Sequence, residues 1–170
     1  MSTYRLNSLL EPNSIALIGA SMRHGSVGQA IVRNIRASGF EGPLGVVNPR
    51  YPEIGGMPTV GRLAELSFVP ELIIVTTPAR TIPEIIAEAG RLGVAGAIIV
   101  SAGLGHGAGS LAEAADRAAR GHRMRLIGPN CLGILMPKVK LNASFTAHMP
   151  RVGNLALISQ SGAIATGMVD

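Results

Sequence analysis

The sequence contains few aromatic residues: tryptophan is absent, and aromatic residues make up only 3% of the 170 positions. The core must therefore be built from isoleucine, valine, leucine and alanine, in a chain with an apolar fraction of 47%. There is little aromatic surface to stack on bases, and the lysines and arginines form no continuous run. These absences argue against nucleic acid as a partner. The net charge of +5 favours a small anionic ligand instead.

Cysteine occurs once, at Cys131, which excludes an internal disulfide and is typical of a reducing, cytoplasmic compartment. The first residues lack the apolar core of a signal peptide, and no apolar run reaches the ~18 residues that a membrane span needs. No spacing of histidine, cysteine and acidic residues resembles a metal site. We therefore expect a cytoplasmic protein with no metal ion and no membrane partner.

Short apolar segments alternate with helical patterns along most of the chain. The expected strands cover residues 15–18, 44–47, 72–75, 97–100 and 125–127. Apolar residues at helical spacing follow at about 27–37, 83–92 and 111–120. Continuously apolar strands that alternate with helices are typical of a parallel sheet covered on both faces. The sequence therefore predicts an α/β fold with a Rossmann-like, doubly wound parallel sheet.

Small or polar residues follow each expected strand, at the edge where doubly wound sheets bind ligands. The first of these turns is the most informative. An apolar strand ends in a glycine, a polar loop over 19–28 follows, and a helical pattern begins at its end. This order presents backbone N–H groups and a helix N-terminus to a phosphate. A phosphate-bearing ligand is therefore predicted at this loop.

The loop matches neither of two common phosphate-binding patterns. Its glycines are Gly19, Gly25 and Gly28, and Ser21 stands where the dinucleotide fingerprint has its second glycine. No Gly-Lys-Ser/Thr follows, which argues against a nucleoside triphosphate. The second strand ends in Asn-Pro-Arg over 48–50, without the acidic residue that NAD-binding proteins usually carry there. The arginine could instead contact a ribose phosphate, which leaves NADP or coenzyme A.

Catalytic side chains do not form a recognisable group in this sequence. The ten carboxylates form no close inward-facing pair, and Ser161 lacks the leading glycine of the G-x-S-x-G nucleophile elbow. His106 lies in a glycine-rich loop, and no basic residue is placed to activate Cys131. We assign no catalytic residue to this chain.

The pattern changes beyond residue 134. Residues 141–145 are expected to form one more short strand, and Pro150 and Gly153 suggest a linker. Residues 154–163 then repeat the opening pattern of apolar strand, Ser/Gly turn and helix start. We expect residues 1–149 to form one domain. Residues 150–170 are expected to be a linker and the first strand, turn and helix of an incomplete second unit.

Six motifs in this order resemble the NDP-forming acyl-CoA synthetases. They are Ser14-Ile-Ala-Leu-Ile-Gly-Ala-Ser21, Gly25-Ser-Val-Gly28, Val47-Asn-Pro49, Arg125-Leu-Ile-Gly-Pro-Asn-Cys-Leu-Gly133, Leu141-Asn-Ala-Ser-Phe145 and Ile158-Ser-Gln-Ser-Gly162. The resemblance covers nearly the whole chain. It is to the α-subunit side of succinyl-CoA synthetase and to ADP-forming acetyl-CoA synthetase. It implies a CoA-binding, Rossmann-like domain followed by the start of a flavodoxin-like second domain.

The resemblance also implies which residues bind coenzyme A or acyl-CoA. The expected contacts are Gly19, Ala20, Ser21, Gly25, Ser26, Val27, Gly28, Asn48, Pro49, Arg50, Thr77, Pro78, Ser101, Ala102 and Gly103. Ser161 and Gly162 are expected to bind phosphate, at a helix N-terminus that faces the phosphorylated histidine or the acyl phosphate. The acyl group would pass between acyl phosphate and CoA through a phosphohistidine outside this chain.

The family's phosphorylated histidine and its nucleotide-binding grasp domain are not among these residues. The expected partners are therefore the remaining domains or a β-type grasp subunit, within an oligomer. His106 stands near a position where the family often carries a glutamate. Two alternatives stay open. The same module opens certain bacterial protein lysine acetyltransferases, where it would be a regulatory CoA-binding domain. The second alternative is that the chain is a fragment of an NAD(P)-binding oxidoreductase.

Overall fold

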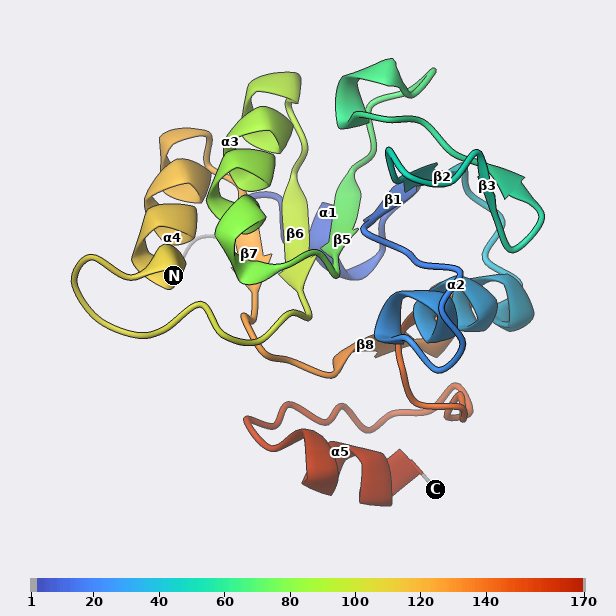
Figure 1. Cartoon of the computed structure of the whole chain (residues 1–170). Coiled ribbons are helices and arrows are strands. Elements are labelled where there is room, and N and C mark those ends of the chain that lie inside the picture. The colour runs from blue at the N-terminus through green and yellow to red at the C-terminus, as the bar shows by residue number, and fades with distance from the viewer. Residues whose placement is uncertain (1–2, 170) are drawn as a thin grey trace.

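Five parallel strands form the central sheet of the computed structural model, which describes residues 3–169 (Figure 1). The strands are β1 (Ile15–Ile18), β2 (Leu44–Val47), β5 (Leu72–Val75), β6 (Gly96–Ile99) and β7 (Arg125–Ile127). Their order is β2-β1-β5-β6-β7, which confirms the doubly wound α/β fold. Only β6 differs from its expected bounds, by one residue. The strand order reverses between β1 and β5, and doubly wound sheets bind ligands at such a point.

Helices cover both faces of the sheet (Figure 1). The covering helices are α1 (Leu6–Leu10), α2 (Val27–Ser38), α3 (Ile82–Leu92) and α4 (Leu111–Gly121), whereas α5 (Gly162–Val169) belongs to neither core. Successive strand residues point to opposite faces, so each strand contributes to two separate cores. Ile15 and Leu17 belong to the core that includes α1 and α2. Ala16 and Ile18 belong to the core that includes α3 and α4. Because both faces are covered, the strands are almost entirely apolar, and the exception is Arg125 at the start of the partly buried β7.

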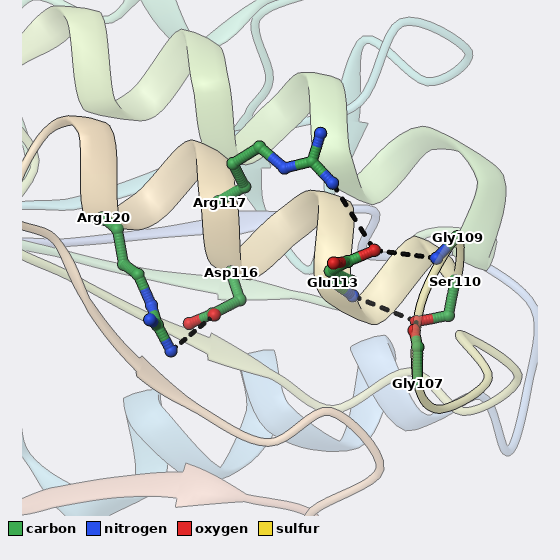
Figure 2. Close-up of polar contacts among 7 residues, drawn as sticks. All are labelled: Gly107, Gly109, Ser110, Glu113, Asp116, Arg117 and Arg120. Atoms are coloured by element: carbon green, nitrogen blue, oxygen red, sulfur yellow. Dashed lines mark hydrogen bonds and ion pairs between the residues drawn. The ribbon is translucent and has the colours of Figure 1, made fainter.

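Helix α4 begins at a cap that the glycine-rich loop after β6 provides (Figure 2). Ser110 Oγ accepts a hydrogen bond from the Glu113 N–H at 3.1 Å, and Glu113 Oε2 accepts one from the Gly109 N–H at 2.7 Å. Two ion pairs follow along the exposed face, Glu113–Arg117 at 3.4 Å and Asp116–Arg120 at 2.8 Å. These contacts stabilise both ends of the helix, since acidic residues suit its N-terminus and basic residues its C-terminus.

An antiparallel hairpin of β8 (Gly133–Met136) and β9 (Leu141–Ser144) packs against α2. The sequence predicted β9 but not its partner. The hairpin is tied to the helix by buried polar groups. The Asn34 amide of α2 donates to the carbonyl oxygens of Ser144 at 2.9 Å and Thr146 at 2.7 Å. Ser144 Oγ donates to Asn142 Oδ1 at 2.7 Å, and all four residues are buried.

The shorter elements lie in connections. They are the hairpin of β3 (Glu53–Ile54) and β4 (Met57–Pro58), and the 3₁₀ turns η1 (Leu63–Glu65), η2 (Ala79–Thr81) and η3 (Pro137–Val139). The sequence over 62–66 predicts a short helix, and the structure has the single 3₁₀ turn η1 there. No helix within residues 3–169 is long and apolar enough to cross a membrane.

The C-terminal segment differs from the expectation in one respect. The helix expected after the Ser/Gly turn forms as α5, but residues 154–158 form no strand. Leu155 and Ile158 are 100% and 97% exposed. A strand needs hydrogen-bonding partners along its length, and no segment of residues 3–169 pairs with this one. The division of the chain after residue 149 stays a prediction.

The buried Asn34 amide gives a test of how the hairpin is held. We expect Asn34→Ala to lower the free energy of unfolding by about 2 kcal/mol, because it removes two buried hydrogen bonds. Urea denaturation followed by circular dichroism measures the change. Arg33→Ala, at the exposed neighbouring position, is the control and should change stability by less than about 0.5 kcal/mol. Equal effects of the two substitutions would contradict this role for Asn34.

Candidate functional site

Two glycines bring the first loop against the end of β5. A Cβ atom on Gly19 would lie 2.6 Å from Thr77 Cγ2, and the backbone there has a φ of +91°. A Cβ atom on Gly28 would lie 2.9 Å from Ala20 Cα and 3.0 Å from Thr76 Oγ1. Neither position has room for a side chain. The loop over 19–28 and the first turn of α2 therefore lie at the point where the strand order reverses.

Side chains of the loop itself hold its shape. Ser26, which is buried, caps α2: its Oγ accepts from the Gln29 N–H at 3.3 Å and lies 3.5 Å from the Ser21 carbonyl oxygen. Gln29 Oε1 in turn accepts from the Gly25 N–H at 3.2 Å. The first N–H groups of a helix have no acceptor within the helix, so this end of α2 can receive an anion.

Asn48 connects the end of β2 to the same loop. Its side-chain amide donates to the Ala20 carbonyl oxygen, and its Oδ1 accepts from the Arg50 N–H at 2.8 Å. Asn48 is buried, whereas Pro49 and Arg50 are exposed. The structure thus brings together predicted residues from two strand ends, with Asn48 fixing the turn that presents Arg50.

Side-chain hydrogen bonds also join the ends of β5 and β6. Ser101 Oγ donates to the Thr77 carbonyl oxygen at 2.6 Å, and Thr77 Oγ1 accepts from Thr81 Oγ1 at 2.9 Å. Pro78, Ala102 and Gly103 are the remaining predicted residues here, and Ala102 and Gly103 are exposed. Predicted residues from four adjacent strands therefore form a continuous rim at the carboxyl edge of the sheet.

Ser161 and Gly162 do not lie on the rim that the four strand ends form. Ser161 Oγ accepts from the Ile164 N–H at 3.4 Å and so caps α5. A Cβ atom on Gly162 would lie 3.8 Å from Leu132 Cβ, which places the start of α5 beside the segment that follows β7. No described contact links this pair to the loop over 19–28.

Three residues that shape the rim were missed from the sequence. Thr76 packs against Gly28 and donates from Oγ1 to the Ile18 carbonyl oxygen at 3.2 Å. Thr81 and Gln29 each hold a predicted residue in place. In the sequence, only the positions of Thr76 and Gln29 could have indicated a role. Thr76 directly follows a strand, and Gln29 directly follows the last glycine of the loop.

The charge of the rim is positive. The loops that begin at residues 19, 48, 76 and 100 contain no aspartate or glutamate up to the start of the next helix or strand. Arg23, His24 and Arg50 are exposed there. The electrostatic potential and the free end of α2 therefore both favour a negatively charged ligand.

Cys131 lies near this edge but is not activated. Its thiol donates to the Ile99 carbonyl oxygen at 3.4 Å, and burial raises the pKa of the thiol above its ordinary value.

Within residues 3–169 the structure has cavities away from the rim. One of about 480 Å³ is lined by Tyr4, Arg120, Arg123, Met124 and Arg125. Another of about 300 Å³ is lined by Leu132, Phe145, Thr146, Ala147, His148 and Thr166. Neither cavity is lined by a residue of the rim.

Comparison with known proteins places the chain in a family. Residues 13–137 match the CoA binding domain family, so the chain belongs to it. An ADP-forming acetate–CoA ligase of Methanocaldococcus jannaschii is 36% identical over 98% of this chain and 24% of its own length. The α subunit of an ADP-forming acetate–CoA ligase I of Pyrococcus furiosus is 33% identical over 96% of this chain and 37% of its own length.

A solved structure supports the same family assignment. The acetyl-coenzyme A synthetase 1 of Ca. Korarchaeum cryptofilum, in complex with phosphate and ADP, superposes with a TM-score of 0.89 at 30% identity. The match covers 96% of this chain and 36% of that one. These comparisons confirm the resemblance to NDP-forming acyl-CoA synthetases and the prediction of coenzyme A as ligand. They also show that the chain spans about a quarter to two fifths of the length of these relatives.

The environment of Cys131 gives a pH-dependent prediction. Alkylation by iodoacetamide at pH 7.5 should be at least about tenfold slower in the folded chain than in urea, because a raised pKa keeps the reactive thiolate scarce. The rate should still be rising as the pH passes the ordinary thiol range. Mass spectrometry of timed samples measures it. A rate that levels off below about pH 8 would contradict the assignment of Cys131 as an unactivated thiol.

Proposed function

We propose that the rim over 19–28, 48–50, 77–78 and 101–103 is the coenzyme A site. The observation that carries the proposal is the crowding at Gly19 and Gly28, which brings the N-terminus of α2 to the switch point of the sheet. A side chain at either glycine would push the loop away from β5. The absence of aspartate and glutamate from the four loops of this rim suits a ligand with several phosphate groups.

Each part of the rim has a proposed role. The loop with Gly19, Ala20, Ser21, Gly25, Ser26, Val27 and Gly28 holds the diphosphate at the end of α2. Arg50 contacts the phosphate on the ribose, with Pro49 beside the nucleotide. Asn48 is a positioning residue, because both of its side-chain polar atoms bind the backbone of this rim. Thr77, Pro78, Ser101, Ala102 and Gly103 line the path toward the thiol.

The longer protein is proposed to be an acyl-CoA synthetase of the ADP-forming acetate–CoA ligase type. Coenzyme A supplies the thiol that accepts the acyl group, and this chain holds and orients it. The proposal is supported by the family match and by the ligase relatives over nearly the whole chain. Because the chain spans a minor part of those relatives, acyl activation is assigned to the other domains or subunits.

The remaining expectations belong to the same proposal. Residues 150–170 begin a second α/β unit, and Ser161 and Gly162 bind phosphate there at the start of α5. The α-subunit relative supports association with further domains or a separate subunit. The oligomeric state and the cytoplasmic location stay predictions that rest on the sequence.

Calorimetry with coenzyme A, NADP and NAD tests the site. The chain should bind coenzyme A and bind the two dinucleotides much more weakly. Gly28→Ala should weaken coenzyme A binding at least about tenfold, because the added Cβ displaces the loop at the ligand. Gly167→Ala, where a Cβ atom would meet nothing within 4 Å, is the matched control and should bind normally. Tight binding of NAD without binding of coenzyme A would overturn the proposal.

Arg50 has a separate, ligand-specific test. Arg50→Ala should weaken coenzyme A about tenfold, the loss of one charge-assisted contact. It should leave dephospho-coenzyme A, which lacks the ribose phosphate, unchanged. Arg33→Ala on the exposed face of α2 is the control. An equal loss for both ligands would assign Arg50 to another part of coenzyme A.

A further inference from the structure

Helices α2 and α4 begin with the same serine cap. Ser26 is the N-cap residue of α2, and its Oγ accepts a hydrogen bond from the Gln29 N–H at 3.3 Å. Ser110 is the N-cap residue of α4, and its Oγ accepts one from the Glu113 N–H at 3.1 Å (Figure 2). The carbonyl oxygens of the two serines accept from the N–H groups four positions further on, at 3.0 and 3.1 Å. The backbone therefore starts both helices in the same way.

The third residue of each helix completes the cap with its side chain. Gln29 Oε1 accepts from the Gly25 N–H at 3.2 Å, and Glu113 Oε2 accepts from the Gly109 N–H at 2.7 Å. Both glycines have a left-handed backbone, with φ of +73° at Gly25 and +78° at Gly109. The two caps thus share these hydrogen bonds and this geometry. They differ in the charge of the acceptor, which is a neutral amide in α2 and a carboxylate in α4.

A carboxylate would stabilise the start of α2 more than the amide does. An ionised acceptor makes the stronger hydrogen bond, and a negative charge is favourable near a helix N-terminus. The other two helices that connect strands of the sheet carry such a charge in their first turns, Glu84 in α3 and Glu113 in α4. The first turn of α2 contains no acidic residue. The helix at the switch point of the sheet is therefore the one whose N-terminal charge the chain leaves uncompensated.

The cap of α2 also leaves two N–H groups without an acceptor. Ser26 accepts from the N–H groups of Gln29 and Ala30. Within residues 3–169 no acceptor lies at hydrogen-bond distance from the N–H groups of Val27 and Gly28, which open the helix. The half-buried Gln29 side chain belongs to the same turn. A carboxylate at this position would repel a phosphate that binds these two N–H groups.

We propose that Gln29 is a specificity-determining residue of the coenzyme A site. Its amide holds Gly25 as a glutamate would, and it leaves the positive end of α2 available to the diphosphate of coenzyme A. The neutral cap gives up some helix stability in exchange for anion binding, whereas Glu113 compensates the same end of α4 within the protein. This inference rests on the function proposed for the rim and adds to it a reason for the residue type at position 29.

The variant Gln29→Glu separates stability from binding. It keeps the acceptor for Gly25 and adds one negative charge, so the melting temperature should stay equal or rise. Calorimetry should show coenzyme A binding weakened at least about tenfold relative to the unsubstituted chain. The ratio of the two affinities should shrink between about 0.1 and 1 M sodium chloride, because the screening length falls from about 10 Å to about 3 Å. A purely structural role of Gln29 would produce neither the gain in stability nor this salt dependence.

Two further variants control for charge and for the cap itself. Ala37→Glu adds the same charge at an exposed position near the other end of α2, about 12 Å away along the helix axis. Coenzyme A should bind this variant within about twofold of normal. Glu113→Gln makes the reciprocal exchange in the cap of α4, and it should lower the melting temperature because the acceptor loses its charge.

Several results would overturn the role of Gln29. They are unchanged coenzyme A binding by Gln29→Glu, equal losses in Gln29→Glu and Ala37→Glu, a lower melting temperature of Gln29→Glu, and an unchanged one of Glu113→Gln. Failure of the unsubstituted chain to bind coenzyme A would contradict the function proposed for the rim, and the role of Gln29 with it. Normal binding by both the unsubstituted chain and Gln29→Glu would contradict the role of Gln29 alone.

Discussion

The close approach of two backbone segments is the constraint on which the rest of this structure depends. Gly28 in the first turn of α2 lies against Ala20 and Thr76, and Gly19 lies against Thr77. These contacts hold the helix N-terminus directly over the ends of β1 and β5. The position of α2 then determines where the loop, the turn after β2 and the hairpin can lie. Packing of this kind tolerates no added methylene group, because protein interiors are close-packed.

Polar side chains connect the other strand ends and the hairpin to this part of the structure. Asn48 joins the β2 end to the loop, and Ser101 joins the β6 end to the β5 end. On the far side of α2, the buried Asn34 amide holds the hairpin. Each is a side chain that binds backbone atoms of another segment. Such bonds position a surface loop without needing a large apolar contact, and buried polar groups of this kind specify one arrangement of the chain.

The strands β1, β2, β5 and β6 could be predicted from the sequence because they are buried almost throughout and read as largely apolar runs. β7 is only partly buried and begins with Arg125, and its place in the alternation of strands and helices predicted it. β8 was missed because its residues are only partly buried and it exists only as the partner of β9. The strand expected over 154–158 carries the right local pattern but has no partner among the described residues. A strand forms only when its backbone hydrogen-bonds to a second strand, and the sequence pattern of one segment does not show whether such a partner is present.

The sequence by itself determined the order of elements, the edge that carries the ligand loop and the class of ligand, because these follow from local periodicity and from motif order. The tertiary structure alone decided which atoms meet. The bond from Asn48 to Ala20, the packing of Thr76 on Gly28 and the joining of Tyr4 to Arg125 connect residues 28, 48 and 121 positions apart. Contacts at such separations depend on how the whole sheet is assembled, and no local pattern encodes them.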